Sequence, residues 1–553
     1  MSTTWAGFGQ LALLLVALAV CHKPLGDYMA RVFTTTRHWA VERWIYRVVR
    51  VDPDSDQRWT TYAYSILGFS FVGVILLYVF QRTQQWLPFA SGHAAVVPSM
   101  AFNTAASFVT NTNWQSYVPE TTLGSTVPMI GLTVQNFLSA AVGIAIAIAL
   151  IRGFIRANTD RLGNAWVDVV RGTVRILLPI AFVSAIVLIG LGVVQSLHSG
   201  VAVTGLDGAH KTLTLYPAAS EESIKELGTN GGGIFNANSA HPFENPNGWS
   251  DLIEIFLILL IPVSLTRTFG VMVKSKKQGY TLLGVMAFIW SCMLAVIWWA
   301  EAHPTGPAAL LAGGGTEGKE VRFGIPASAL FANSTTSTST GAVNAMHDSL
   351  SGLGGGGALL NMMFSEMTPG GVGTGIYSIL VMAIIAVFLA GLMVGRTPEY
   401  LGKKLGKTEV TMASVAILAM PTAVLVLTGL AIALPSTGSA LNNTGEHGFS
   451  EVLYAFTSAS NNNGSAFAGI TVTSNFFQST LGIAMLVGRF VPIVAVLCLA
   501  GALARQKKVE PTAGTLPTSG PLFATMVTFS IVLVAAIVFV PALALGPIAE
   551  AVS

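Results

Sequence analysis

The chain is a succession of long apolar runs separated by short polar segments. A helix needs roughly 20 apolar residues to cross the ~30 Å hydrocarbon core of a bilayer. Runs of about that length recur along the whole chain. The pattern predicts ten transmembrane helices, at residues 5–21, 62–82, 127–151, 173–197, 250–272, 280–300, 359–395, 412–434, 475–503 and 521–546.

The seventh run, 359–395, is too long for one crossing and is interrupted in its middle. Residues 368–375 contain one proline and four glycines, which sustain a helix interior poorly. The sequence therefore predicts a helix broken by an unwound loop. We interpret Gly370, Gly371, Gly373 and Gly375 as a gate loop beneath a pore, and the alternative is a plain loop leading into a normal span.

Four strips rich in Ser, Thr, Asn and Gly lie between the apolar runs. Their third residues are 118, 110 and 123 positions apart, and a short segment of helical pattern precedes each strip, at 97–108, 218–227, 326–337 and 449–459. Polar backbone at membrane depth is tolerated only where protein buries it or where it lines a watery cavity. The repeat predicts four pore loops around one axis, whereas any single strip could be an ordinary polar outer loop. The strips are Asn111-Thr112-Asn113, Thr229-Asn230-Gly231, Ser339-Thr340-Gly341 and Asn462-Asn463-Gly464.

The chemistry of the strips suits a cation. Each short helix would point its C-terminal end, which carries a partial negative charge, at its strip. Backbone carbonyls can replace the hydration shell of an ion, and glycine can adopt the positive φ that turns carbonyls inward. None of the four strips contains a carboxylate, which favours a monovalent cation, K⁺ over Ca²⁺.

Composition and charge support a membrane protein. Hydrophobic residues make up 52% of the 553 residues, charged residues only 10%, and the mean hydropathy is +0.64. Soluble domains usually carry about 25% charged residues. Alternate connecting loops hold 23 of the 29 Lys and Arg residues, so the positive-inside rule places those loops in the cytoplasm. Both termini and all four strips are then predicted outside, while the small net charge of +3 gives no reason to expect a nucleic-acid partner.

Uphill transport would need an energy source that this sequence does not show. The chain lacks Asp-Lys-Thr-Gly-Thr, the phosphorylation motif of P-type ATPases. Residues 402–408 come one residue short of a Walker A loop, and they follow a helix rather than a strand. We therefore expect no catalytic site and no nucleotide in this chain, and ATP chemistry in another one.

Several long strings resemble the potassium-binding, channel-like subunit of the bacterial Kdp-type potassium-transporting ATPase (the KdpA family). They lie at residues 228–233, 236–246, 343–349, 395–404 and 459–469, and the resemblance covers essentially the whole chain. It implies an all-α integral membrane fold with four pore-loop repeats about a pseudo-four-fold axis and one extra helix at each end. Asn113 stands where the other strips have Gly, so the ring is not expected to be symmetric.

The same resemblance implies a division of the chain and a setting for it. The division is 1–60 for the N-terminal helix and cytoplasmic loop, 61–160, 161–275, 276–405 and 406–508 for the four pore repeats, and 509–553 for the C-terminal helix. The implied ion is K⁺. The implied partners are a P-type ATPase catalytic subunit and small accessory membrane subunits, within the bilayer of the bacterial cytoplasmic (inner) membrane.

A few further residues are candidates for supporting roles. Gln115 and Gly232 adjoin strips and are assigned to filter support. Glu366 and Arg489 are charges within apolar runs, which form either a structural salt bridge or the lining of the ion's exit path. Arg396 belongs to a basic inner loop that is either a plain topology signal or a contact with the ATPase partner.

Two other functions compete with K⁺ selection for a partner pump. One is a stand-alone K⁺ uptake channel or symporter with the same pore loops, against which the two extra spans argue. The other is a non-transporting membrane scaffold that anchors an ATPase. A scaffold would need no polar backbone on a pore axis, so the four strips argue against it.

Overall fold

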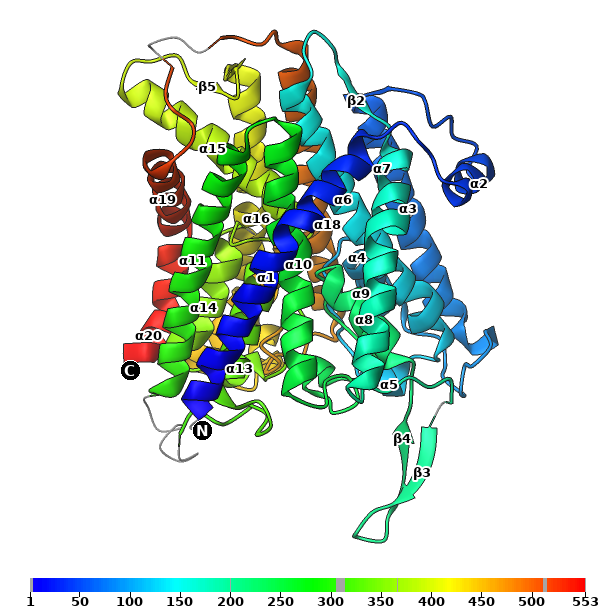
Figure 1. The fold of residues 1–553 in the computed structure, drawn as a ribbon. Helices are drawn as coiled ribbons and strands as arrows, with labels where there is room; N and C mark the ends of the chain where they lie inside the picture. Colours follow the sequence, from blue (N-terminus) through cyan, green and yellow to red (C-terminus); the bar gives the residue numbers. More distant parts are fainter. Residues whose placement is uncertain (1–2, 199, 305–313, 366, 511–514, 553) are drawn as a thin grey trace.

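The computed structural model is predominantly helical and describes residues 3–198, 200–304, 314–365, 367–510 and 515–552. Within these ranges ten helical segments are long and apolar enough to cross a membrane, which confirms the predicted number. Figure 1 shows them side by side in one bundle. These spans are Thr4–Thr34, Trp59–Trp86, Val127–Ile155, Ala165–Gly190, Gly248–Met272, Lys276–Ala302, Thr374–Met393, Lys407–Ile432, Asn475–Arg505 and Pro521–Leu545.

The helices that make up these spans keep the order of the chain. They are α1 (Thr3–Thr34), α3 (Trp59–Thr83), α6 (Thr133–Ile155), α7 (Ala165–Arg171) continuing into α8 (Leu178–Gly190), α10 (Gly248–Met272), α11 (Lys276–Ala302), α15 (Thr374–Met393), α16 (Lys407–Ile432), α18 (Asn475–Arg505) and α19 (Pro521–Leu545). A π-helical turn precedes α6 at Val127–Leu132, and another joins α7 to α8 at Gly172–Leu177.

Apart from the broken seventh span, the largest differences from the predicted boundaries are in the first and fourth spans. The first helix continues to Thr34 instead of ending near residue 21, because Pro24 is accommodated and Asp27 pairs with Arg267 of α10 at 2.7 Å. The fourth span runs from Ala165 to Gly190 rather than from 173 to 197. Gly192 adopts a φ of +102°, and the Val193 amide donates to the Leu188 carbonyl, which together form a Schellman cap.

The seventh span is broken as predicted. Its first part is α14 (Gly352–Met363), which is too short to cross the membrane, and α15 resumes at Thr374. Irregular backbone joins the two helices. Only α15 qualifies as a span, so the count of ten is preserved.

Four short helices lie between consecutive spans, within a few residues of the predicted positions. They are α4 (Pro98–Val109), α9 (Ala218–Leu227), α13 (Gly324–Ser337) and α17 (Gly445–Ser460). Contacts close the four units into a cycle: α6 touches α9, α10 touches α13, α14 touches α17, and α18 touches α4 and α6. This is the expected four-repeat fold, with α1 and α19 as the extra helices.

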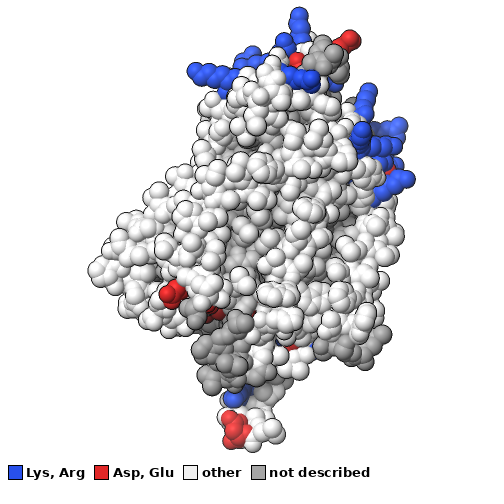
Figure 2. Space-filling view, turned by 90° about the vertical axis from the view of Figure 1, so that its left-hand side faces the viewer, with Lys and Arg blue, Asp and Glu red and all other residues white. Residues whose placement is uncertain are grey.

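The two ends of the bundle differ in charge. Figure 2 shows Lys and Arg gathered at one end, where the hairpins β1 (Gln57–Arg58) with β2 (Arg161–Gly163) and β5 (Glu399–Tyr400) with β6 (Lys403–Lys404) lie. The first and last described residues lie at the opposite end, where Lys and Arg are few (Figures 1 and 2). That end also carries the hairpin β3 (Gly200–Thr204) with β4 (His210–Thr214). The remaining short helices are α2 (Ala40–Val48), α5 (Pro119–Thr122) and α20 (Pro547–Val552).

The core surrounds α6, whose residues from Ile144 to Ile151 are fully buried. Helices α10, α15 and α18 contribute to the same apolar cluster. A helix this apolar on every side is typical of the centre of a large membrane bundle. The division of the chain at 60, 160, 275, 405 and 508 stays a prediction.

Candidate functional site

Each strip begins as the C-terminal cap of the short helix before it. The first residue of every strip is left-handed, with φ between +50° and +67°, although none of these four residues is glycine. The amide of the middle residue then donates to the carbonyl five residues earlier, as in a Schellman motif. The four bonds are Thr112 to Ser107 at 2.9 Å, Asn230 to Lys225 at 2.9 Å, Thr340 to Thr335 at 3.0 Å and Asn463 to Ser458 at 2.9 Å.

The strips touch one another in a closed cycle. A Cβ added to Gly341 would collide with the carbonyl of Asn463, and one added to Gly464 would collide with that of Thr112. A Cβ on Gly231 would lie 3.0 Å from the Thr340 oxygen. Strip two thus faces strip three, three faces four, and four faces one. The ring closes where Asn111 of strip one donates from Nδ2 to the Thr229 carbonyl at 2.8 Å.

The polar side chains of the strips brace the ring. Asn230 donates to the side-chain oxygens of Asn111 and Asn113, both at 2.9 Å. Asn462 donates to the hydroxyl of Thr112 at 3.0 Å, and Asn463 donates to the Thr335 carbonyl at 2.9 Å. The Ser339 hydroxyl donates to the Asn461 carbonyl at 3.0 Å. These bonds hold neighbouring strips in register while their backbone stays packed edge to edge.

Strip two departs from the other three by one residue. The second left-handed position falls on Asn113, Gly341 and Gly464 in strips one, three and four, but on Gly232 rather than Gly231 in strip two. A Cβ on Gly232 would lie 2.8 Å from the Asn113 carbonyl. Gly232 therefore lies in the ring against strip one, and its assignment to filter support stays a prediction.

A cavity of about 460 Å³ opens onto one side of the ring. Asn113, Gly341 and Gly464 of strips one, three and four line it, together with Gly232, which directly follows strip two, and Gln115. The side-chain oxygen of Gln115 accepts from the Gly233 amide at 2.9 Å. Gln115 thus ties repeat one to the backbone that follows strip two, and its role in supporting the filter stays a prediction.

The loop between α14 and α15 lies against the other side of the ring. The Gly370 amide donates to the Ser337 carbonyl at 2.9 Å, and the Val372 amide donates to the Thr229 hydroxyl, also at 2.9 Å. A Cβ on Gly371 would lie 2.9 Å from the Thr338 carbonyl. The loop therefore contacts the ends of the second and third short helices, at the positions where strips two and three begin.

Two more glycines of this loop have no room for a side chain. Gly373 has a φ of +86°, and a Cβ there would collide with the backbone of Gly143 in α6. A Cβ on Gly375 would collide with the Pro369 carbonyl. Glu366 lies outside the described residues.

Arg489 of α18 is connected to strip one. Its side chain is 3% exposed and donates from Nη2 to the Ser139 carbonyl at 3.1 Å. The Ser139 hydroxyl in turn donates to Oδ1 of Asn111 at 2.7 Å. In the ranges that the structure describes, no carboxylate forms an ion pair with Arg489. Arg396, by contrast, is exposed at the basic end and touches no strip among those ranges.

The sequence reading missed a buried charge cluster on α9. Lys225 is fully buried, and its ammonium forms ion pairs with Glu222, with Glu226 at 3.7 Å and with Glu244 at 3.4 Å. Burial raises the pKa of Glu226 and of Glu244 well above its usual value, against the attraction of Lys225. The sequence did hold a signal for this cluster: residues 221–226 include four charged residues, in a chain of which only 10% is charged.

This cluster is linked to strip two by hydrogen bonds. The Lys225 carbonyl accepts the Asn230 amide, and the Lys225 ammonium donates to Oδ1 of Asn238 at 3.2 Å. Asn238 donates in turn to the Gly232 carbonyl. The acids of α9 thus pair with Lys225, which binds Asn238, and Asn238 binds the ring.

Four pore loops around one ring, within a bundle of ten spans, define a multi-pass membrane protein of the pore-loop class. The solved structure of the potassium transporter TrkH from Vibrio parahaemolyticus has the same fold, with a TM-score of 0.51 and 14% identity, over 77% of this chain and 83% of that one. The likeness at this identity concerns the fold alone.

Sequence comparison gives the family. The family model described as "Potassium-transporting ATPase A subunit" (KdpA) matches residues 12–552, and this chain belongs to that family. Two relatives are named "Potassium-transporting ATPase potassium-binding subunit". The one from Rhodococcus erythropolis is 61% identical over 560 residues and the one from Streptomyces coelicolor 56% over 554 residues, in each case across 100% of both chains.

Proposed function

We propose that this chain binds extracellular K⁺ in its ring of four strips and delivers it to a partner P-type ATPase subunit for ATP-driven uptake. The observation that carries the proposal is the closed cycle of the strips, in which the backbone of each reaches the next. The names of the relatives, which are potassium-binding subunits of an ATPase, supply the ion and the kind of complex.

The chemistry of the ring suits a weakly hydrated monovalent ion. Its members are backbone groups and the neutral side chains of Ser, Thr and Asn, without a carboxylate in any strip. Four short helices end at the ring, so four partially negative helix termini surround the same point. Carbonyl oxygens on a braced backbone can then replace the water that K⁺ loses as it enters.

The side from which the ion enters follows from charge. The positive-inside rule assigns the Lys- and Arg-rich end to the cytoplasm. The opposite end then lies outside the bacterial cytoplasmic membrane, with both termini. K⁺ enters through the cavity of about 460 Å³ lined by Asn113, Gly232, Gly341 and Gly464.

The α14–α15 loop is the proposed gate. It contacts Thr229, the first residue of strip two, and Ser337, two residues before strip three, on the side of the ring away from the cavity, so an ion that leaves the ring inward meets Gly370–Gly375. Arg489 lies beside strip one through Ser139, where its positive charge would repel a cation from the bundle and direct it towards the partner. Arg396, exposed at the cytoplasmic end, is the proposed contact with that partner, and the small accessory subunits complete the complex.

A carboxylate placed in the ring tests the proposal. Gly231→Asp puts a charge and a side chain where a Cβ already lies 3.0 Å from the Thr340 carbonyl. We expect K⁺ affinity of the purified full-length chain, measured by isothermal titration calorimetry, to fall at least about tenfold, equivalent to ~1.4 kcal/mol. The control is Gly438→Asp, at a position on the same side with open space around it, which should bind K⁺ as the unmodified chain does.

The competing functions predict other results. A scaffold predicts that Gly231→Asp leaves K⁺ affinity unaltered. A stand-alone channel or symporter predicts K⁺ flux into liposomes that contain this chain without an ATPase subunit. Our proposal predicts binding without sustained flux in that preparation.

A further inference from the structure

A second group of candidate ligands lies away from the ring, at the end opposite the one rich in Lys and Arg. Asp348 lies in the turn before α14, His447 and Glu451 lie one turn apart on α17, and Glu550 lies on α20. The imidazole of His447 bridges two carboxylates, with Nε2 3.3 Å from Oδ1 of Asp348 and Nδ1 2.9 Å from Oε1 of Glu550. Three segments that are distant in sequence meet here.

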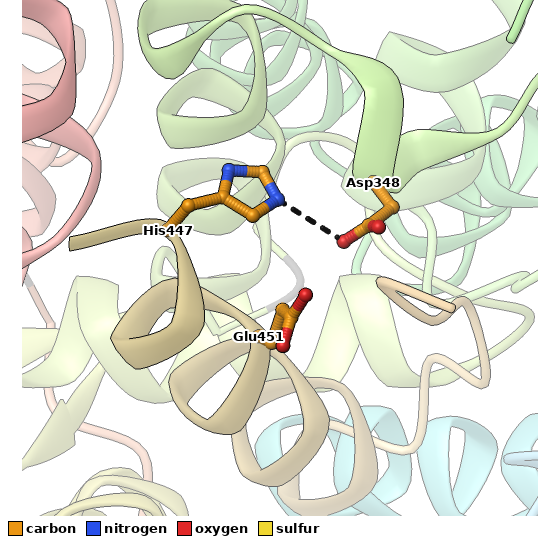
Figure 3. A group of neighbouring side chains, drawn as sticks. All are labelled: Asp348, His447 and Glu451. Atoms are coloured by element: carbon orange, nitrogen blue, oxygen red, sulfur yellow. Dashed lines mark hydrogen bonds and ion pairs between the residues drawn. The ribbon is translucent and has the colours of Figure 1, made fainter. Parts of the chain in front are cut away.

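Asp348, His447 and Glu451 converge on one point. Figure 3 shows their side chains facing a common space between α17 and the segment before α14. One ligand atom from each lies within 4.8 Å of the other two. Three atoms within that limit lie at most ~2.8 Å from a common centre, so each needs to move by at most ~0.7 Å to reach the ~2.1 Å typical of zinc ligands.

Glu451 supplies an independent indication of a ligand. Its side chain is fully buried, and Oε2 has no hydrogen-bond partner among the described residues. The other oxygen accepts from Asn443 at 2.7 Å. A buried carboxylate oxygen without a donor is costly, and coordination of a cation would remove that cost.

The two acids also approach each other. A Cβ on Gly469 would collide with Oε1 of Glu451 and lie 2.6 Å from Oδ2 of Asp348, so both carboxylates reach the same glycine. In the described part of the chain, no Lys or Arg forms an ion pair with Asp348 or Glu451.

We propose that Asp348, His447 and Glu451 form a binding site for a divalent transition-metal ion of the Zn²⁺ class, with Glu550 accepting from Nδ1 on the far side of the imidazole and orienting it. An imidazole among carboxylates favours Zn²⁺, because Ca²⁺ and Mg²⁺ prefer oxygen ligands. The metal takes the position between the acids, and the proton on the imidazole leaves to solvent. Binding would tie α20 to the third and fourth repeats beside the cavity, which His347 helps to line.

Zinc binding to the full-length chain tests this proposal. Metal-free purified chain is dialysed against buffered Zn²⁺ and its metal content is measured. We expect one Zn²⁺ per chain that neither Mg²⁺ nor Ca²⁺ displaces, and at least tenfold weaker binding in the isosteric variants Asp348→Asn and Glu451→Gln. The matched control is His210→Gln, an exposed histidine on the β3–β4 hairpin, which should leave Zn²⁺ binding unchanged.

Two further measurements separate a metal site from a structural ion pair. Zn²⁺ should raise the melting temperature of the unmodified chain and of His210→Gln, and not that of Asp348→Asn. K⁺ binding by the same samples reports that each variant is folded. The proposal is overturned if the unmodified chain takes up no Zn²⁺, or if Asp348→Asn and Glu451→Gln bind it as the unmodified chain does.

Discussion

The closed ring predicts a specific intolerance at Gly464. The residue has a φ of +100°, and a Cβ there would collide with the carbonyl of Thr112 in the neighbouring strip. Gly464→Ala therefore imposes two costs, a left-handed alanine and a steric overlap with backbone that cannot rotate away. Thr112 and residue 464 would have to separate by about an ångström to restore an ordinary contact.

The expected effect can be sized from these costs. A strained backbone conformation costs on the order of 1–3 kcal/mol, and the displacement of a carbonyl in the ring adds to the loss. If the strain is carried by the ion-binding conformation, K⁺ affinity falls by about 5- to 150-fold at ~1.4 kcal/mol per factor of ten. Isothermal titration of the purified chain with K⁺, and with Na⁺ as competitor, measures both affinity and selectivity.

Gly445 provides the matched control. It has a φ of +69° and nothing within 4 Å of an added Cβ, so Gly445→Ala carries the left-handed strain without the collision. We expect Gly445→Ala to bind K⁺ within about twofold of the unmodified chain. Equal K⁺ affinities for Gly464→Ala and Gly445→Ala would refute the closed ring as the binding element.

Three further predictions concern the surroundings of the ring. Gly373→Ala should abolish K⁺ uptake by the assembled complex in vesicles and leave equilibrium K⁺ binding intact, because the gate loop no longer fits against α6. The control is Gly395→Ala, at a position with a φ of +66° and open space around it. Normal uptake by Gly373→Ala would argue against a gate. Arg489→Gln should reduce uptake with little change in melting temperature, and full uptake would exclude a role for this charge in transport. Lys225→Met should lower the free energy of unfolding by about 3–5 kcal/mol, because it leaves three buried carboxylates without their cation. Its melting curve is compared with that of Lys211→Met, a variant of an exposed lysine on the β3–β4 hairpin. Equal melting temperatures for the two variants would contradict the prediction.

The fold could be predicted from the sequence because its determinants are local. Each of these features depends on one continuous segment of sequence: the ten apolar runs, the four short helices and the break in the seventh span. The structure has all of them. The errors are at boundaries. Thr34 replaces residue 21 as the end of α1 because an ion pair with Arg267, more than 230 positions away, extends the helix.

The details of the site depended on contacts between distant residues. The sequence showed the strips as polar segments. The hydrogen bonds that brace them, however, join residues such as Asn462 and Thr112, which are 350 positions apart. The offset in strip two and the place of Gly232 in the ring follow from backbone φ values that composition does not encode. The cluster around Lys225 was missed because i,i+3 and i,i+4 charge pairs are commonest on exposed helices.

The most direct test of the account is the position of the bound ion. Crystals of the full-length chain soaked in Tl⁺, an anomalous scatterer that substitutes for K⁺, would locate it in diffraction data. The account predicts an anomalous peak enclosed by the four strips, between Thr112, Asn230, Thr340 and Asn463. Anomalous peaks elsewhere in the molecule, with none within the ring, would contradict it.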